Sequence, residues 1–318
     1  MRSKRDSALE LVLPATSANL GPAFDAAALA FRLYLNVRAR AAPAFSIQAE
    51  GRDADLCGQL ENHLILTTYR EVLEEQGKRV TPLALRIENE MPIGKGCGSS
   101  AAARLAGIAL AVHFGKLGWN DRQIIGEASR REHHPDNAAA CWMGGLCVAR
   151  MDSASEAQAV KIVPKGKWPL LLAVPNEALS TEEARRVLPD QYSRGDAVSN
   201  IQNSMLLLSA FVQGRHDLLA SALQDKIHQP YRARLCPLLP AVQEMQAREG
   251  MLGVALSGAG PSVLVFLDPS YLVKKSKAAM VRHLGKHGLS AELFLTSIAD
   301  KGASDEKGWK KARGRARG

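Results

Sequence analysis

The chain has 318 residues, of which 46% are hydrophobic, and it carries a formal net charge of +9. This length allows one large domain or two ordinary ones, with enough apolar side chains for a substantial core. No uninterrupted apolar run reaches the about 18 residues of a membrane-spanning helix, and the N-terminus lacks the apolar core of a secretory signal. We therefore expect a cytoplasmic protein with no membrane partner.

The cysteines agree with that location. There are five, an odd number, and no two of them form a C-x-x-C pair. This pattern predicts reduced thiols rather than a disulfide framework or a zinc site. They are Cys57, Cys97, Cys141, Cys147 and Cys236.

Most of the basic excess lies at the C-terminus. Six lysines and arginines fall within the last twelve residues, 307–318, which contain no acidic residue. We predict a disordered basic tail over 304–318, because this composition offers little to bury. Such a tail could contact nucleic acid or another acidic surface, or it could serve only to keep the protein soluble.

The first half of the chain alternates strands and helices. Leucines at 9, 11 and 13 predict a strand that stops at Pro14, and a second alternation predicts a strand over 31–37. The intervening residues, 14–30, begin with a run of turn formers. Further along we expect a helix at 60–76, a strand at 83–87, a glycine loop at 92–100 followed by a helix that ends near Gly115, a helix capped by Asn120 or Asp121, and a strand at 145–148.

The polar stretch 151–168 suggests a boundary between a domain of residues 1–155 and a second of residues 156–303. In the second domain we expect strands at 170–174, 254–256, 263–266 and 291–296. Helices are predicted from Ser180 onward and at 197–213, 216–225, 238–248 and 270–287. The mixture has no strict βαβ period, which indicates an α+β fold in both halves.

The glycine loop is the most informative stretch. Glycines at 94, 96 and 98 alternate with other residues, and two serines follow at the start of a helix. Glycines let backbone N–H groups crowd around an anion, and a helix N-terminus adds partial positive charge. Lys95 could add a cation, and Ser99 and Ser100 could bind phosphate or a metal ion. The alternative is a glycine-rich turn that only caps a helix; the loop is neither a Walker A loop nor G-x-G-x-x-G.

This loop resembles the P-x-x-x-G-x-G-S-S-A-A loop of the GHMP kinases, a family that includes galactokinases, homoserine kinases and mevalonate kinases. Cys97 stands where the family most often has Leu, and its sulfur is a small hydrophobic group, so the replacement is tolerable. The resemblance implies that the nucleotide phosphates are bound by this segment. The residues concerned are Pro92, Ile93, Gly94, Lys95, Gly96, Cys97, Gly98, Ser99, Ser100, Ala101 and Ala102.

Five further stretches resemble the same family, in the same order along the chain. Residues 14–25, PATSANLGPAFD, resemble the homoserine kinase signature, with Ala23 in place of the usual Gly. Residues 132–137 match E-x-H-P-D-N, residues 181–189 match T-x-x-A-R-x-x-L-P, and residues 228–232 read H-Q-P-Y-R. The SGAGPS segment at 257–262 matches the third GHMP motif. The resemblance spans residues 9 to about 296.

The resemblance implies a two-domain fold, with an N-terminal domain like ribosomal protein S5 domain 2 and a C-terminal ferredoxin-like α/β plait. It implies phosphorylation of the side-chain hydroxyl of L-homoserine by ATP with Mg²⁺, giving O-phospho-L-homoserine for threonine synthesis. Ser100 and Glu132 would hold the metal, with Glu127 as the fallback, and Asn62 would lie on the nucleotide side. The residues expected to orient the amino acid are Asn19, Asp25, His134, Asn137, Arg185 and Arg232, with Gly260 beside them.

The residue chemistry supports these roles. A carboxylate such as Asp25 pairs with an ammonium group, and two arginines suit an α-carboxylate. Asn137 stands where mevalonate kinases have an acidic base, so we expect the hydroxyl proton to pass to solvent or to the γ-phosphate. Two alternatives stay open: another GHMP small-molecule kinase of the mevalonate type, and a non-catalytic binding protein with this fold. The sequence leaves the oligomeric state open, including a homodimer.

Overall fold

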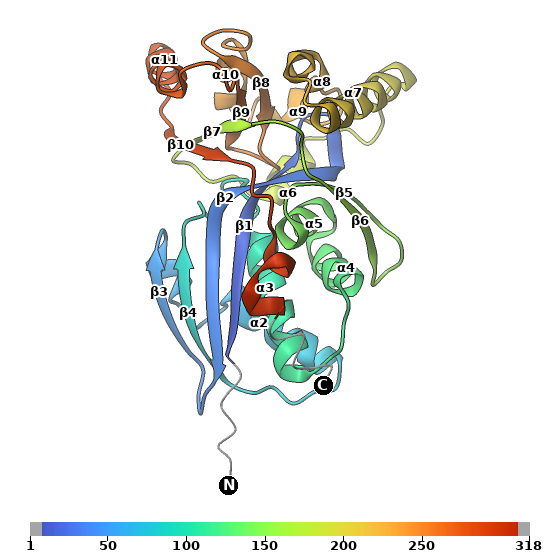
Figure 1. The fold of residues 1–318 in the computed structure, drawn as a ribbon, viewed down its shortest axis with the longest axis vertical. Coiled ribbons are helices and arrows are strands. Elements are labelled where there is room, and N and C mark those ends of the chain that lie inside the picture. Colours follow the sequence, from blue (N-terminus) through green and yellow to red (C-terminus); the bar gives the residue numbers. More distant parts are fainter. Residues whose placement is uncertain (1–7, 311–318) are drawn as a thin grey trace.

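The computed structural model describes residues 8–310, and the chain forms one sheet in each half of the molecule (Figure 1). The N-terminal sheet has six strands and the C-terminal sheet has four. Among the described residues, no helix is both long and apolar enough to cross a membrane. All five cysteines are free and buried, in agreement with the prediction of reduced thiols.

The N-terminal sheet has the order β3-β4-β2-β5-β6, and β1 also pairs with β2. Its strands are β1 (Leu9–Asn19), β2 (Ala23–Ala41), β3 (Ser46–Gly51), β4 (Leu83–Asn89), β5 (Leu146–Met151) and β6 (Ala157–Ile162). Its helices are α1 (Ala54–Cys57), α2 (Leu64–Glu75), α3 (Ser99–Gly115), α4 (Asp121–Glu132) and α5 (Asp136–Met143). The predicted capping residue of α4 is Asn120, whose side chain accepts a hydrogen bond from the N–H of Gln123.

The hairpin of β1 and β2 corrects the prediction that the first strand stops at Pro14. The strand continues to Asn19, with a register shift between Pro14 and Ala15. A proline cannot donate a ladder hydrogen bond, and an irregularity in the register accommodates it. Most of the stretch 14–30 is therefore strand, and only residues 20–22 form the turn.

Small side chains bring α5 close to this hairpin. Residues 27–30 of β2 and 138–140 of α5 are buried, and all but Leu29 are alanine. Helix α5 contacts both β1 and β2. Because alanine has only a methyl group, the helix backbone can approach the sheet closely, which brings the start of α5 beside β1. Helices α2 to α5 lie together on one side of the sheet (Figure 1).

The C-terminal sheet has the order β10-β7-β9-β8, with all pairs antiparallel. Its strands are β7 (Pro169–Val174), β8 (Met251–Leu256), β9 (Val263–Leu267) and β10 (Glu292–Ser297). Its helices include α6 (Thr181–Arg186), α7 (Arg194–Gln213), α8 (Leu219–Ala222), α9 (Gln229–Arg232), α10 (Leu238–Gln243) and α11 (Val273–Lys286). The chain order strand, helices, two strands, helix, strand gives the expected ferredoxin-like plait.

The change from one sheet to the other lies later than the predicted boundary at residue 155. Strand β6 still pairs with β5 in the N-terminal sheet, and β7 begins the other sheet. The chain therefore passes between the halves at residues 163–168. The polar composition of 151–168 marks the exposed β5–β6 hairpin as well as this connection.

The C-terminal segment differs from the predicted tail. After β10 the chain returns to the N-terminal half, where the N–H of Ala299 donates a hydrogen bond to the carbonyl of Ala30. The chain then forms a short helix at Ala303–Asp305 (Figure 1). Trp309 is only 2% exposed and packs edge-on against Trp142, with ring centroids 5.0 Å apart. Disorder from residue 304 onward was therefore a wrong prediction for 304–310, because one tryptophan supplies enough apolar surface to hold the segment. Residues 311–318 lie outside the described residues.

The tip of the β1–β2 hairpin inserts into the C-terminal half. The carbonyl of Gly21 accepts a hydrogen bond from Nε2 of His228 at 2.8 Å, and that of Pro22 accepts one from Nδ2 of Asn200 at 2.6 Å. A Cβ on Gly21 would lie 2.4 Å from the carbonyl oxygen of Leu223, so only glycine fits at this crossing. The tip thus fixes the position of the two halves relative to each other.

Replacing Trp309 tests whether the C-terminal segment is part of the core. We expect Trp309→Ala to lower the free energy of unfolding by about 3–5 kcal/mol, because it leaves a large cavity against Trp142. Urea unfolding followed by circular dichroism measures this. Lys307→Ala, at an exposed position two residues earlier, serves as the control and should leave stability unchanged. Equal stability of both variants would show that the segment does not contribute to the core.

Candidate active site between the two halves

A cleft lies where the glycine loop, the hairpin tip and the C-terminal half meet. It holds about 640 Å³ of empty space, including the part open to solvent. All seven residues predicted to act on the amino acid line it, together with much of the glycine loop and Glu132. The lining residues are Ala18, Asn19, Asp25, Gly94, Gly96, Cys97, Gly98, Ser99, Ser100, Glu132, His134, Asp136, Asn137, Leu179, Thr181, Arg185, Arg232, Gly258, Ala259 and Gly260.

The glycine loop is shaped by what packs behind it. Gly96 and Gly98 have φ of 76° and 70°, which L-residues rarely adopt. A Cβ on Gly96 would lie 2.2 Å from the carbonyl oxygen of Ser257, and one on Gly98 would lie 1.9 Å from Oγ1 of Thr16. The loop leads into α3, and the residue at the N-cap position, Gly98, provides no side-chain hydrogen bond to the start of the helix. The first N–H groups of this helix therefore lie at the cleft and can bind an anion.

A serine and a carboxylate meet at the start of α3. Oγ of Ser100 donates a hydrogen bond to Oε1 of Glu132 at 2.6 Å, and Nε of Arg104 lies 2.6 Å from the same oxygen. Glu132 ends α4, and its side chain is 12% exposed. Glu127, the fallback metal ligand, does not line the cleft; it pairs with Arg130 and Arg131 on its own helix.

Asn137 is held by a residue that sequence reasoning did not select. Oγ1 of Thr16 donates to Oδ1 of Asn137 at 2.6 Å, and the N–H of Thr16 donates to the carbonyl of Cys97 at 3.1 Å. Thr16 thus connects β1, the glycine loop and α5. Asn137 lines the cleft, and its amide nitrogen has no hydrogen-bond partner among the described residues; this nitrogen can donate a hydrogen bond but cannot accept a proton.

His134 and Asp136 form a buried pair beside Asn137. Nδ1 of His134 lies 2.7 Å from Oδ1 of Asp136, and Oδ2 of Asp136 is buried without a hydrogen-bond partner among the described residues. Burial on its own lowers the pKa of His134, but the bond to Asp136 and the negative charges of Asp136, Asp25 and Glu132 outweigh it. The pKa of His134 is therefore raised above 6.5. The imidazole gains positive charge toward the cleft.

Asp25 and Arg185 pair with each other across the cleft. The carboxylate accepts two hydrogen bonds from the guanidinium, at 3.0 and 2.7 Å, and about a third of each side chain is exposed. Asn19, at the hairpin tip, is fully engaged in the scaffold: its Nδ2 donates to the carbonyl of Gly258 and its Oδ1 accepts from the N–H of Asp25, each at 2.9 Å. The amide of Asn19 therefore positions Asp25.

Arg232 is buried, with 1% of its surface exposed. Its Nε donates to the carbonyl of Ala184 at 2.9 Å, and Nη1 lies 3.2 Å from Nδ1 of His228. Burial, together with the charge of Arg185, lowers the pKa of Arg232 to about 10, so it stays protonated at neutral pH. Burial also lowers the pKa of His228, which fits a neutral ring that donates through Nε2 to Gly21 and accepts from Arg232 through Nδ1. Much of the H-Q-P-Y-R motif is thus structural support.

Several predicted phosphate-loop residues do not face the cleft. Nζ of Lys95 donates to the carbonyls of Pro175 and Asn176, so this lysine ties the loop to the C-terminal half. Asn62 is exposed in the loop before α2 and is not among the residues that line the cleft. Cys97 is among the residues that line the cleft, but its side chain is fully buried, and this burial raises its pKa to about 12. Four other residues predicted to bind the nucleotide are not among those that line the cleft: Pro92, Ile93, Ala101 and Ala102.

Four residues that support the site were not selected from the sequence. Each of them makes a hydrogen bond or ion pair that fixes the position of a neighbouring group. Thr16 and Asp136 stand inside motifs that the sequence had already singled out, so their position was a usable signal. Arg104 lies one helical turn after Ser100, on the same face of α3, which is the spacing of neighbouring side chains on a helix. Asp225 accepts from the N–H groups of His228 and Gln229 at 2.9 and 2.6 Å, and nothing local in the sequence indicated it.

Known proteins share both the sequence and the fold. The profile of the GHMP kinase N-terminal domain matches residues 63–145, and that of the C-terminal domain matches residues 207–286. The homoserine kinase of Solibacter usitatus is 41% identical over 301 residues, which cover 94% of this chain and 98% of that protein.

Two crystal structures show how widely the fold is shared. The homoserine kinase of Cytophaga hutchinsonii has a TM-score of 0.77 at 23% identity and covers 95% of this chain and 98% of that one. The mevalonate kinase of L. major, in complex with R-mevalonate, has a TM-score of 0.68 at 14% identity and covers 95% and 100%. Both family profiles match in order and the Solibacter relative spans nearly the whole chain, so the chain belongs to the GHMP kinase family and, within it, to the homoserine kinases.

Proposed function

We propose that this protein transfers the γ-phosphoryl group of ATP to the side-chain hydroxyl of L-homoserine. The observation that carries the proposal is the Asp25–Arg185 pair, which faces the same cleft as the glycine loop. A carboxylate and a guanidinium side by side complement the ammonium and carboxylate of an amino acid. The five free, buried cysteines fit a reducing compartment, so we place this reaction in the cytoplasm.

In this proposal the glycine loop binds the ATP phosphates. The N–H groups at the start of α3 donate to phosphate oxygens, and the glycines keep side chains out of the way. Phosphoryl transfer depends mainly on positioning and on neutralising charge, and this loop does both. His134, with its raised pKa, adds positive charge to the same cleft.

Ser100 and Glu132 are suited to Mg²⁺, which prefers oxygen ligands, usually one or two carboxylates together with substrate phosphates. Their oxygens lie 2.6 Å apart at the end of the phosphate loop, and Arg104 holds the Glu132 carboxylate in place. Bound at these oxygens, Mg²⁺ would neutralise charge on the phosphates. Ser100 and Glu132 would hold it there.

Asp25 and Arg185 would bind the amino-acid end of the substrate, leaving the hydroxyl toward the phosphates. Arg232 lies behind this pair, 5.3 Å from the centre of the Phe24 ring, over which Arg185 also stacks. As the hydroxyl oxygen bonds to the γ-phosphorus, the bond from phosphorus to the β–γ bridging oxygen breaks and ADP leaves. Each carboxylate that lines the cleft already has a cationic partner, so we assign the hydroxyl proton to solvent or to the transferred phosphate.

Measuring ADP release with L-homoserine, mevalonate and galactose tests the proposal. We expect turnover with L-homoserine only, because neither other compound has an ammonium group for Asp25. Preferred turnover of mevalonate would instead support the mevalonate-type alternative. No turnover with any alcohol, combined with ATP binding, would support a non-catalytic binding protein.

Ser100→Ala tests the phosphate and metal end of the cleft. We expect kcat to fall by about 100-fold, since a group that stabilises developing charge on the phosphates is lost. Ser99→Ala is the matched comparison, because Ser99 lines the cleft but has no side-chain bond to Glu132. Steady-state kinetics over a range of Mg²⁺ concentrations measures both. Equal effects of the two substitutions would contradict a special role for Ser100.

Arg185→Ala tests the amino-acid end. Loss of a charge-assisted contact worth about 1.5–3 kcal/mol should raise the KM for L-homoserine about tenfold to a hundredfold, with little change in the KM for ATP. Arg186→Ala is the matched control, since the side chain of Arg186 is 72% exposed and, among the described residues, pairs only with Glu182. Homoserine methyl ester should be a poor substrate of the parent enzyme and lose little more with Arg185→Ala. Equal losses for acid and ester would place Arg185 elsewhere in the reaction.

The titration of His134 can be followed by NMR, with the signal assigned from its absence in His134→Gln. We expect a pKa above 6.5, and Asp136→Asn should lower it by removing the partner charge. Because the pKa is raised in the folded state, protonation stabilises the fold. That contribution is fully present below pH 6.5 and is lost as pH rises through the raised pKa. A pKa at or below 6.5 in the parent protein would contradict the charge assigned to His134.

A further inference from the structure

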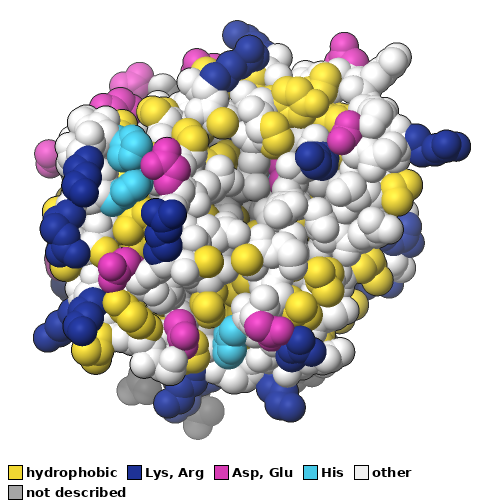
Figure 2. All heavy atoms as spheres, turned by 90° about the horizontal axis from the view of Figure 1, so that it is seen from above, with side chains coloured by type: hydrophobic (Ala, Val, Ile, Leu, Met, Phe, Trp, Pro, Cys, Tyr) yellow, Lys and Arg dark blue, Asp and Glu magenta, His cyan; other side chains and the backbone are white. Residues whose placement is uncertain are grey.

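A group of potential metal ligands lies outside the cleft, on the C-terminal half. Glu244 directly follows α10, while His283 lies in the last turn of α11 and His287 just beyond that helix. One ligand atom from each of the three residues lies within 4.8 Å of the others. Figure 2 shows a pair of histidine side chains beside an acidic one on this face of the molecule. None of the three lines the cleft.

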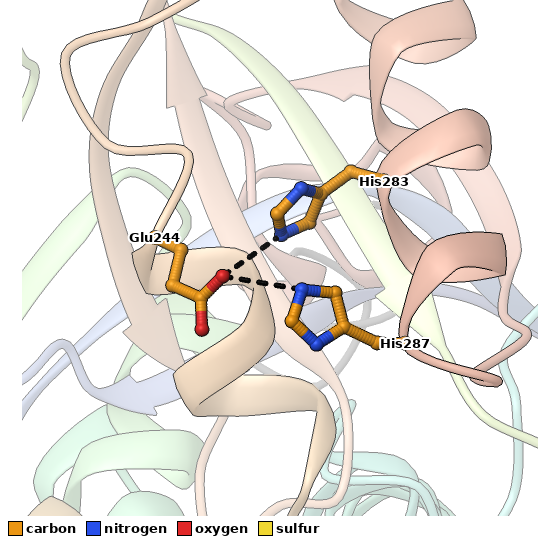
Figure 3. A group of neighbouring side chains, drawn as sticks. All are labelled: Glu244, His283 and His287. Atoms are coloured by element: carbon orange, nitrogen blue, oxygen red, sulfur yellow. Dashed lines mark ion pairs between the residues drawn. The ribbon is translucent and has the colours of Figure 1, made fainter.

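The side chains converge on one point (Figure 3). Oε2 of Glu244 lies 3.1 Å from Nε2 of His287 and 3.5 Å from Nε2 of His283. Tetrahedral zinc with bonds of about 2.0–2.1 Å keeps its ligand atoms about 3.3 Å apart. The two measured separations lie on either side of that value, so one ion can reach all three atoms without a large movement of the backbone.

The backbone supports this arrangement. His283 lies in the last turn of α11 and His287, four residues later, is the C-cap residue of that helix, and their ring centroids lie 4.6 Å apart. Apolar side chains of α10 and α11, among them Val242, Met280 and Leu284, belong to the same buried cluster. The elements that carry the ligands are therefore held rigidly against each other, and little entropy is lost when an ion joins them.

We propose that Glu244, His283 and His287 bind a divalent transition-metal ion of the Zn²⁺ class, which links the end of α10 to the end of α11. Two imidazoles and one carboxylate are ligands that Zn²⁺ accepts. The ion takes the Nε2 lone pair of each ring. In His283 this nitrogen lies 2.8 Å from the carbonyl oxygen of Ala241, so its proton moves to Nδ1 and the carbonyl becomes a further oxygen near the ion.

The same geometry would also suit a plain ion pair between Glu244 and protonated histidines. Two features could weaken metal binding at this site: nearby basic side chains and competing cysteines. Basic side chains border the group (Figure 2), but their repulsion of a cation is screened by salt. Direct coordination bonds are short and are not screened in this way. The five cysteines, which could compete for the ion, are all buried.

Zinc titration of the tag-free, full-length chain tests the proposal. Isothermal titration calorimetry with Zn²⁺, after treatment with a chelator, should show one saturable site and a rise in Tm on binding. Glu244→Gln and His287→Asn should each weaken binding at least about tenfold and abolish the rise in Tm. Glu244 is 56% and His287 37% exposed in the side chain, so both variants should fold as the parent does. Kinase activity without Zn²⁺ should be unchanged in both.

Two further variants locate the site. His216→Asn is a matched control, because Nε2 of His216 also contacts a backbone carbonyl, that of Lys167 at 3.0 Å, but has no second histidine beside it. Asp136→Asn disrupts the acid and histidine group of the cleft, the other place where ligand atoms cluster. Both should bind Zn²⁺ as the parent does. The proposal is overturned if the parent shows no saturable binding, if Glu244→Gln and His287→Asn bind like the parent, or if only Asp136→Asn loses the site.

Discussion

The insertion of the β1–β2 hairpin tip into the C-terminal half is the contact on which the rest of the structure depends. It brings Asn19 and Asp25, from the first sheet, against Gly258 and Arg185, from the second half. The carbonyls of Gly21 and Pro22 at this tip need hydrogen-bond donors because they are buried between the two halves. The side chains of His228 and Asn200 supply those donors. Together with the bonds from Lys95 to the C-terminal half, these bonds fix the orientation of the two halves and hold one wall of the cleft in place.

Charge in the cleft is balanced in pairs before any substrate arrives. Glu132 is matched by Arg104, Asp136 by His134, and Asp25 by Arg185. Such pairs fix the direction of each side chain, which reduces the reorganisation needed when a highly charged substrate binds. Arg232 adds one buried positive charge, and a neutral His228 supports it through an acceptor nitrogen without adding repulsion.

The family shares its fold across different substrates, as the mevalonate kinase of L. major shows at 14% identity. Substrate choice must therefore depend on side chains in the cleft rather than on the sheets. The glycine loop and α3 present backbone N–H groups, which suit any nucleotide phosphate. In the proposed reaction, the Asp25–Arg185 pair is the part that would distinguish an amino acid from an alcohol without an ammonium group. This division assigns binding of ATP to the backbone and selection of the second substrate to side chains.

The sequence by itself determined the α+β fold class and most strands and helices, because spacing and turn chemistry are local properties. Its resemblance to the GHMP kinases indicated the segments that line the cleft. Every residue assigned to the amino acid lines the cleft. Only the tertiary structure decided that Lys95 turns to Pro175, that Asp25 and Arg185 pair, and that Trp309 joins the core. These outcomes depend on which residues far apart in the chain come into contact. The local sequence does not show which of several possible partners a charged side chain will pair with. The contact of Glu244 with two histidines about forty residues later arises in the same way, from the packing of α10 against α11.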